Sequence, residues 1–397
     1  MGGNAKPPDG TTEPPATAGQ AGSTLSDRER IDRLRLIRSE NVGPITFRRL
    51  IARFGSAAAA IDALPRLARR GGTRAAPRIC TAAEAEAELA ALEAWGARLV
   101  AIDEADYPPL LAYMDDAPPL VAMLGCASIL QRPAVAIVGA RNASLNGRRM
   151  AADLARDLGA AGCSVVSGLA HGIDAAAHAA ALGSGTVAVV AGGIDVVYPQ
   201  DHQDLYAAIA ERGLILAEMP PGLRPQAGHF PRRNRLISGT CRGVVVVEAS
   251  LRSGSLITAR LALEQGREVL AVPGSPLDPR ARGANDLIRQ GATLVESAAD
   301  VLNALSRPAP RPVAAPAVPV AEVDPDDAEP DPSPDAAGRI AAALSAAPVT
   351  VDELIRSCQL SPPLVNTILL EWELAGRIER LPGNRIAMIA FAKTPSR

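Results

Sequence analysis

The first part of the chain alternates apolar and polar residues with the period of an α-helix. Ile31, Leu34 and Ile37 recur at helical spacing after Asp27, and a second apolar pattern follows the turn at 41–43. A glycine turn between two helices lets backbone amides approach a phosphate, so this segment predicts a helix-hairpin-helix domain. A direct DNA contact and a purely structural corner both remain open for this turn.

Short apolar runs separated by helical patterns fill the central region. This alternation is typical of a parallel β-sheet covered by helices on both faces. Such sheets bind ligands at the carboxyl ends of their strands, and Arg141, Gly168, Gly192 and Glu248 each follow an apolar run. After a helix near 82–95 and a strand at 98–102, the runs lie at 135–139, 163–166, 187–190, 214–217, 244–247, 269–272 and 293–295.

The composition changes twice after the predicted sheet. A Pro/Ala-rich and then acidic stretch at 306–335 predicts a linker that proline stiffens and charge extends. Apolar residues between Ile340 and Leu374 predict a small helical core, and the alternating segment at 377–389 predicts a hairpin. Helices followed by such a hairpin indicate a winged helix. Because the linker is long, this module need not share a core with the central domain.

These patterns divide the chain into five parts. The fold class is α/β, with a Rossmann-like parallel sheet between a helical N-terminal domain and a C-terminal winged helix, and 397 residues suffice for several domains. We expect a disordered tail at 1–26, a helix-hairpin-helix domain at 27–75, the sheet domain at 76–305, a Pro/acidic linker at 306–335 and the winged helix at 336–391.

Lysine is confined to the two ends of the chain, at Lys6 and Lys393. A Walker P-loop requires a lysine in its glycine-rich loop, and a Schiff-base enzyme requires one in its pocket. The sequence therefore excludes ATP-driven motors and pyridoxal-phosphate enzymes. The formal net charge is −2, yet residues 221–290 hold eleven arginines against five acidic residues, which predicts a local basic surface.

The cysteines and the N-terminus indicate the cellular compartment of the protein. Five scattered cysteines form no Cys-x-x-Cys pair, which argues against a disulfide framework and a thiolate zinc site. The first 24 residues lack the apolar core of a signal peptide, and no run approaches the roughly 18 apolar residues of a membrane span. We therefore expect a cytoplasmic protein without a membrane span.

Two segments are candidates for binding phosphates. The loop containing Arg141 and Ser144 lies between a strand and a helical pattern, which predicts an anion site at the helix N-terminus. It is no dinucleotide fingerprint, because Gly139-x-Arg141 replaces G-x-G. We expect the second segment, Phe230-Pro-Arg-Arg-Asn-Arg235, to lie in a Gly/Pro-rich loop, where guanidinium groups would bind phosphates and the ring would stack on bases. The alternative is a solvated loop with Phe230 in the core.

Several other polar residues have simple structural explanations. Asp174 and His171 could form an acid/base pair, but Gly-Ile-Asp174 before an alanine-rich helix is more simply an N-cap. His171 and His178 lie seven residues apart on one helical face without a third ligand, so we expect no metal site. Ser255 and Thr258 are equally explained by capping and lining the helix that begins there.

Several motifs in order make the chain resemble the DNA-processing proteins of the DprA/Smf family. The resemblance runs from the helix-hairpin-helix to Leu305, and the winged helix fits as the family's optional C-terminal module. The chain departs at Gly239-Thr-Cys241, where the family usually has Gly-Leu-Ser, which concerns local packing only. The matching motifs are Ile137-Val-Gly-Ala-Arg141, Ser167-Gly-Leu-Ala-His-Gly-Ile-Asp174, Gly192-Gly-Ile-Asp195, Phe230-Pro-Arg-Arg-Asn-Arg-Leu-Ile-Ser238, Glu248-Ala, Ser253-Gly-Ser-Leu-Ile-Thr-Ala259, Pro273-Gly274 and Gly283-Ala-Asn-Asp-Leu-Ile288.

The resemblance implies an extended Rossmann fold that binds single-stranded DNA in a basic pocket. It further implies a homodimer that protects incoming DNA and delivers the recombinase RecA during natural transformation, without catalysis or a cofactor. By the same resemblance, Arg141 would grip a phosphate, Ser167 and Gly168 would shape the pocket floor, Arg233 and Arg235 would contact the DNA backbone, and Phe230 would stack on a base. The other expected DNA-binding residues are Ser144, Arg232, Asn234, Ser255 and Thr258.

The main alternative is a Rossmann enzyme similar to the nucleotide ribohydrolases with a lysine-decarboxylase-like fold. Those enzymes use a Pro-Gly-Gly loop with a threonine and a glutamate, whereas Ala191-Gly192-Gly193-Ile194 lacks both the threonine and the following glutamate. A structural adaptor acting only through the winged helix would leave the basic segment unexplained. We therefore expect a binding protein and no enzyme.

Overall fold

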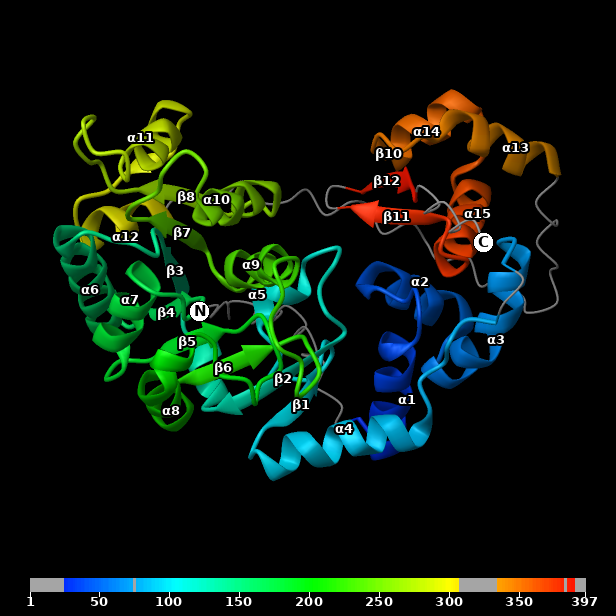
Figure 1. Ribbon diagram of the computed structural model, residues 1–397, viewed down its shortest axis with the longest axis horizontal. Helices are drawn as coiled ribbons and strands as arrows, with labels where there is room; N and C mark the ends of the chain where they lie inside the picture. Colours follow the sequence, from blue (N-terminus) through cyan, green and yellow to red (C-terminus); the bar gives the residue numbers. More distant parts are fainter. Residues whose placement is uncertain (1–24, 74–75, 307–333, 382–383, 390–397) are drawn as a thin grey trace, which may run out of the picture.

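A computed structural model describes residues 25–73, 76–306, 334–381 and 384–389. The predicted tail at 1–26 and linker at 306–335 lie largely outside these ranges. Their described ends belong to helices, because Ser26 caps the first helix and Pro334 begins α13 (Pro334–Ala343). Three folded parts follow one another along the chain (Figure 1).

The N-terminal part is helical, as predicted, and its helices begin at recognisable caps. The hydroxyls of Ser26 and Ser56 accept N–H bonds from the first turns that follow them, and Pro44 occupies a first-turn position after Gly43. Thr81 and Glu84 form a capping box at the fourth helix. The helices are α1 (Asp27–Arg38), α2 (Pro44–Phe54), α3 (Ala57–Arg70) and α4 (Ala82–Ala94).

The central part is built on a nine-stranded sheet with the order β1-β2-β6-β5-β4-β3-β7-β8-β9. The strands from β6 to β9 in this order are parallel, as the continuous apolar runs predicted, while β1 and β2 form an antiparallel edge. The strands are β1 (Arg98–Ala101), β2 (Leu120–Gly125), β3 (Ala134–Val138), β4 (Ser164–Ser167), β5 (Thr186–Val189), β6 (Leu214–Ala217), β7 (Gly243–Val246), β8 (Glu268–Ala271) and β9 (Thr293–Leu294).

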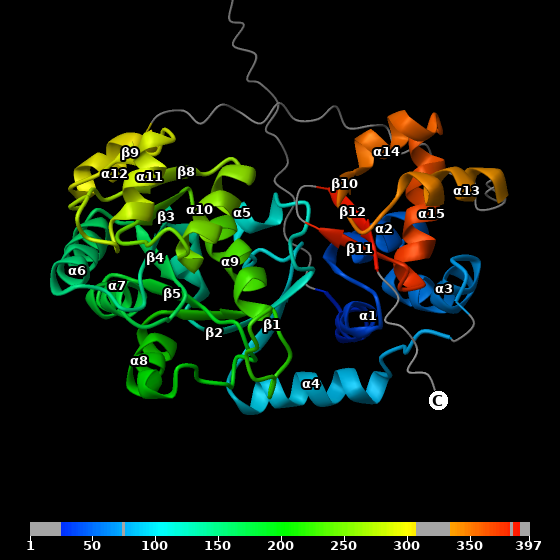
Figure 2. The same ribbon diagram turned by 45° about the horizontal axis from the view of Figure 1, so that its top comes forward.

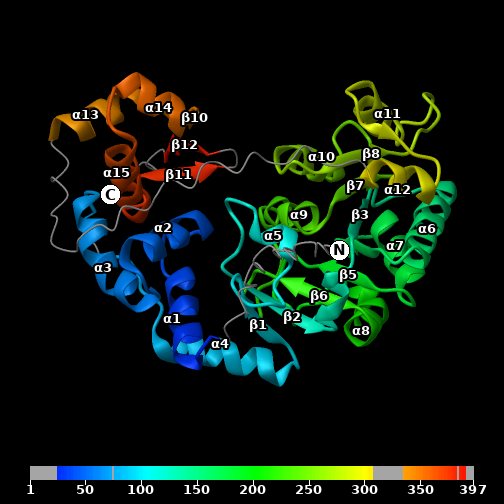
Figure 3. The same cartoon turned by 180° about the vertical axis from the view of Figure 1, so that it is seen from behind.

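Helices cover both faces of this sheet. One face packs against α5 (Pro109–Ala112), α9 (His229–Thr240), α10 (Gly254–Glu264) and α11 (Arg282–Arg289). The other face packs against α6 (Leu145–Ala160), α7 (Ile173–Ala181), α8 (Gln203–Arg212) and α12 (Ala298–Ser306), and Figure 3 shows the same layers from behind. Short 3-10 helices, η1 (Ala127–Gln131) and η2 (Gln200–His202), complete the domain. The result is a three-layer α/β domain of the Rossmann type.

The C-terminal part is the predicted winged helix. A three-stranded antiparallel sheet in the order β10-β12-β11 packs on three helices around a core that includes Ile340, Leu354, Ile368 and Trp372. The predicted hairpin is formed by β11 (Ile378–Leu381) and β12 (Arg385–Met388). The remaining elements are β10 (Val349–Thr350), α14 (Val351–Cys358) and α15 (Pro362–Leu374).

The winged helix shares a hydrophobic core with the N-terminal helical domain. Leu370 and Leu374, on the face of α15 that points away from the winged-helix core, are buried among Phe47, Leu50 and Leu67 of α2 and α3. Figure 2 shows α15 beside α3, while the central sheet lies on the far side of α2. We expected the winged helix to be independent of the central domain, but we did not expect it to pack on the N-terminal helical domain.

Polar contacts fix the same interface. Glu371 pairs with Arg70 at 3.1 Å, and Arg377 donates to the Gly71 carbonyl at 3.2 Å. Gly71 has no room for a side chain, because a Cβ there would lie 2.0 Å from the backbone oxygen of Glu371. The Asn41 side chain donates to the Leu374 carbonyl at 3.2 Å. The turn at 41–43, for which a direct DNA contact had remained open, therefore faces the winged helix.

Leu374→Ala should therefore loosen the joined N-terminal and winged-helix unit. Leu374 is 1% exposed, and truncating such a leucine costs about 2–5 kcal/mol through lost apolar contact and a residual cavity. Urea unfolding monitored by Trp372 fluorescence in a Trp95→Phe background measures the change in the free energy of unfolding. The control is Leu277→Ala, because Leu277 is 88% exposed and its loss should matter by less than about 0.5 kcal/mol. Equal stability of the two variants would show that the interface contributes nothing.

Candidate nucleic-acid interface

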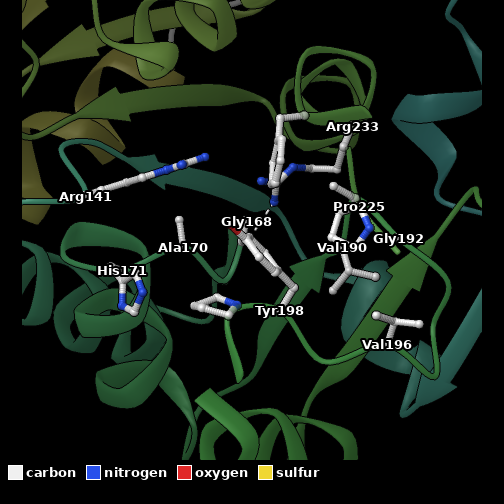
Figure 4. A pocket seen from close by; sticks show the side chains of 13 residues that line it. Arg141, Gly168, Ala170, His171, Val190, Gly192, Val196, Tyr198, Pro225 and Arg233 are labelled. Carbon is white, nitrogen blue, oxygen red and sulfur yellow. Dashed lines mark hydrogen bonds between the residues drawn. The ribbon is translucent and has the colours of Figure 1, made fainter. Parts of the chain in front are cut away.

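A pocket opens at the carboxyl ends of β3, β4 and β5. Its walls come from the loops that follow these strands and from the start of α9, so stretches far apart in the sequence meet there (Figure 4). This is where a parallel sheet gathers ligand-binding loops, as the sequence pattern predicted. The lining includes Arg141, Gly168, His171, Tyr198, Phe230 and Arg233.

A cation and two aromatic rings form one wall of the pocket. The exposed Arg141 places its guanidinium carbon 5.2 Å from the centre of the Phe230 ring, and the Tyr198 ring centre lies 5.7 Å from that of Phe230. Phe230 is half-buried, so the ring is neither fully in the core nor free in solvent. Tyr198 was not among the residues predicted from the sequence, although an aromatic residue shortly after the Gly192-Gly193 turn at a strand end was a usable signal.

The loop between β4 and α7 is held by buried polar side chains. The Asp174 carboxylate accepts from the N–H groups of Gly168 (3.1 Å) and Ala170 (3.3 Å), and His178 Nε2 accepts from the Leu169 N–H at 3.3 Å. Asp174 is not the N-cap that we expected, because Gly172 occupies that position and Asp174 lies inside α7. Burial raises the pKa of Asp174, while Arg233 opposes the rise. The loop thus has a fixed shape before any ligand binds.

Arg233 forms part of the pocket floor. It is 6% exposed, and its Nη1 donates to the carbonyl oxygens of Gly168 and Val189, both at 2.6 Å. Burial lowers the pKa of Arg233 to about 10, so the group stays protonated at neutral pH. Nη1 of Arg233 thus serves the protein, while its buried Nε has no hydrogen-bond partner among the described residues, and the expected contact of Arg233 with a DNA backbone stays a prediction. Gly168 is required next to it, since a Cβ there would lie 2.0 Å from Nη1.

The segment at 230–235 is the start of helix α9, where a Gly/Pro-rich loop was expected. The helix turns Arg235 inward, to 6% exposure, where it donates to the Asp116 carbonyl at 2.6 Å and pairs with Glu218 at 2.5 Å. The expected contact of Arg235 with a DNA backbone likewise stays a prediction. Arg232 remains exposed, and the half-buried Asn234 approaches only the Gly254 carbonyl, at 3.4 Å.

The anion site predicted at the N-terminus of α6 is already filled by a side chain of the protein. One Glu248 oxygen accepts from the Ser144 hydroxyl at 2.6 Å and the other from the Ser144 N–H at 3.0 Å. A carboxylate at this position satisfies free amide groups and the helix dipole, as a phosphate would. Ser144 is the N-cap of α6, and its expected DNA contact stays a prediction.

Three further expected DNA contacts are buried. Ser167 is fully buried and its hydroxyl donates to the Ile137 carbonyl at 2.6 Å, which ties β4 to β3. Ser255 and Thr258 are 8% and 2% exposed and lie inside α10, where the Ser255 hydroxyl contacts that of Ser253 at 2.7 Å. Their structural explanation holds. Of the predicted residues, the structure gathers Arg141, Gly168, Phe230 and Arg233 around one pocket.

Comparison with known proteins gives consistent matches along the chain. The family described as DNA recombination-mediator protein A matches residues 98–306, the DprA-like N-terminal HHH domain matches 27–91, and the DprA winged helix domain matches 324–384. The DNA processing protein DprA of Streptococcus pneumoniae is 47% identical over 198 residues, which are 49% of this chain and 70% of that protein. The chain belongs to the DprA/Smf family.

Other members of the DprA/Smf family agree with this assignment. Protein Smf of Escherichia coli is 38% identical over 306 residues, covering 76% of this chain and 80% of that protein. The X-ray structure of DprA from Streptococcus pneumoniae has a TM-score of 0.59 at 36% identity, covering 70% of this chain and 98% of that one. The resemblance drawn from the sequence motifs is thereby confirmed. Within the described residues, every helix of this DprA/Smf protein is too short or too polar to cross a membrane.

Buried His178, which holds the pocket loop, should make stability depend on pH. The Thr186 hydroxyl donates to the Val165 carbonyl at 2.9 Å, so His178 Nδ1 donates to Thr186 at 2.7 Å and Nε2 stays an acceptor. Burial lowers the pKa of His178 to about 3, below the value of about 6.5 in the unfolded chain. The unfolded state therefore takes up the proton first, and stability falls as pH drops below about 6.5, by up to about 1.4 kcal/mol per pH unit.

His178→Gln removes this titration. The stability gap between the natural protein and the variant, measured by urea unfolding from pH 7.5 to 4.5, should shrink as the pH falls. Asp174 titrates in both proteins, so its contribution cancels in the difference. Parallel stability curves would contradict a buried neutral imidazole.

Proposed function

We propose that this protein binds single-stranded DNA in the pocket, protects it, and delivers the recombinase RecA onto it during natural transformation and recombination. We further propose that it acts in the cytoplasm as a homodimer and without catalysis. The observation that carries the proposal is the wall formed by Arg141, Phe230 and Tyr198 above the buried cation of Arg233.

This wall suits a single strand better than a duplex. Bases of a single strand are free to stack on aromatic rings, whereas the bases of a duplex are already stacked and paired. The exposed guanidinium of Arg141 provides a fork for phosphate oxygens. The charge of Arg233 at the pocket floor attracts the phosphate chain. None of these groups reads the edges of bases, so little sequence preference is expected.

Single-stranded DNA should therefore bind more tightly than blunt duplex of the same length. The logarithm of the affinity should fall with the logarithm of the salt concentration, at roughly 0.7 per phosphate contact. Fluorescence anisotropy of labelled single strands and duplexes over a salt series measures both quantities. Equal or tighter binding to the duplex would refute the proposal.

Variants in the wall should separate the two kinds of contact. Arg141→Ala should weaken binding and flatten the salt slope, because one ionic contact is lost. Phe230→Ala and Tyr198→Ala should each cost about 1–3 kcal/mol with the slope unchanged. Arg212→Ala is the matched control, because exposed Arg212 ends α8 beside the amino end of β6, at the other edge of the sheet. If the control weakens binding as much as Arg141→Ala, the pocket is not the binding site.

The absence of catalysis is also a proposal, and the placement of two carboxylates supports it. Both oxygens of Asp195 accept from the Gly222 N–H, at 2.8 and 2.9 Å, and both oxygens of Glu248 are bound to Ser144. Each carboxylate thus already has a structural role in the fold. Incubation with nucleoside monophosphates or ATP should release no product by chromatography. Product formation that Glu248→Gln or Asp195→Asn abolishes would favour the ribohydrolase alternative.

RecA delivery rests on the family relationship, since the matching family is described as a DNA recombination mediator. The test is the rate at which RecA forms filaments on single strands coated with single-strand-binding protein. Addition of this protein should raise that rate, and Arg141→Ala should reduce the effect because the strand is no longer held. Sedimentation velocity of the free protein tests the dimer.

A further inference from the structure

Three potential metal ligands meet at the mouth of the pocket. His171 comes from the loop after β4, whereas Asp201 and His202 come from η2, thirty residues later. One ligand atom of each lies within 4.8 Å of the others, and His171 Nδ1 is 3.6 Å from Asp201 Oδ2. From the sequence we expected no metal site, because His171 and His178 had no third ligand in view. In the structure His178 is buried and bonded to Thr186 and Leu169.

The backbone fixes the tautomer of His202. Its Nδ1 lies 3.0 Å from the Leu169 carbonyl oxygen, and a carbonyl only accepts, so Nδ1 carries the hydrogen. The lone pair of the neutral ring is therefore on Nε2. Metal-binding histidines are commonly oriented in this way, with one ring N–H bonded to a backbone carbonyl and the other nitrogen bound to the metal.

The loop that carries His171 is fixed as well. Asp174 and Arg233 hold Gly168, while His178 and His202 hold Leu169 through its N–H and its carbonyl. His202 is thus both a ligand candidate and a support of the loop that presents the other histidine. The two rings stand edge to face with centres 4.7 Å apart.

We propose that His171, Asp201 and His202 bind one divalent metal ion of the zinc class. Two imidazoles and one carboxylate form a donor set that such ions prefer. Ligand atoms around a tetrahedral zinc at about 2.1 Å lie about 3.4 Å apart, so small rotations of the exposed His171 and Asp201 side chains complete the geometry. Three protein ligands leave one position open.

The open position determines what the metal would do. His171 lines the pocket together with Arg141 and Arg233, so an ion bound to it borders a site rich in positive charge. That surrounding favours an anionic fourth ligand. On the proposed DNA-binding function, a phosphate oxygen of the strand would take this position, and metal and single strand would each strengthen the binding of the other.

The test begins without DNA. Full-length protein without a polyhistidine tag, in a Cys126→Ser background that removes the exposed thiol, is titrated with Zn2+ by calorimetry and with Co2+ by visible absorption. One ion per chain is expected. His171→Ala and His202→Ala should each weaken Zn2+ binding by at least about 10–100-fold, since losing only a supporting partner of a ligand already has this effect.

Two further variants test whether a loss of Zn2+ binding is specific to the three proposed ligands. Asp201→Asn changes an exposed side chain that the fold does not depend on, so weaker Zn2+ binding in this variant cannot come from misfolding. His229→Gln is the control, because His229 accepts from the Gln226 N–H and belongs to no ligand cluster. Zn2+ binding that all three cluster variants leave unchanged, or no binding of either ion, would overturn the proposal.

The link to DNA is measured separately. Zn2+ should tighten single-strand binding by the natural protein and leave binding by Asp201→Asn unchanged. DNA binding in the presence of EDTA tests the proposed function alone. Metal binding with no DNA binding would therefore refute the proposed DNA-binding function and support the metal site. DNA binding with no metal binding would refute the metal site alone.

Discussion

The buried guanidinium of Arg233 joins the elements that make the pocket. It comes from α9 and binds the carbonyl oxygens at the ends of β4 and β5, while the charge of Asp174 faces it from α7. Burying a charge is unfavourable unless partners and hydrogen bonds compensate it, and removing one partner of a buried pair typically costs about 3–5 kcal/mol. The pocket therefore depends on an interaction that leaves the guanidinium largely inaccessible to a ligand.

This arrangement divides the arginines of the basic segment into two groups. Arg233 and Arg235 are buried. Arg233 donates to a backbone carbonyl at the pocket floor, and Arg235 forms an ion pair with Glu218. Arg141 reaches the pocket from a different loop and keeps its donors exposed beside Phe230. A buried cation at the pocket floor and an exposed cation on its wall make the pocket positive. Both charges therefore attract a phosphate chain, although only Arg141 is exposed.

The second organising contact lies far from the pocket. Helix α15 occupies the position that reads the major groove in many winged-helix proteins, yet its outer face carries Leu370, Glu371 and Leu374 packed on the N-terminal helices. The helix contains no arginine or lysine. The docked winged helix therefore acts as part of a helical unit, and this face of α15 is unavailable to a DNA duplex.

The sequence determined the elements, because apolar periodicity and caps are local properties. It located the apolar strand runs of the sheet, the hairpin of the winged helix and the motif residues at the strand ends, and these motifs identified the family. Arg141, Gly168 and Phe230 were found because each lies in such a motif next to a strand or helix end.

Tertiary structure decided which polar groups remain available. Glu248 fills the anion site at Ser144, although the two residues are 104 positions apart, and the helical turn of α9 carries Arg235 inward. His171 meets Asp201 and His202 only when two loops fold together, so spacing along the chain showed no third ligand and we expected no metal site. The sequence gives the type of each side chain, but the partners of that side chain come from helices, strands and loops that are distant in the sequence. Because a buried donor or acceptor must be satisfied, those partners decide whether a residue serves the fold or the ligand.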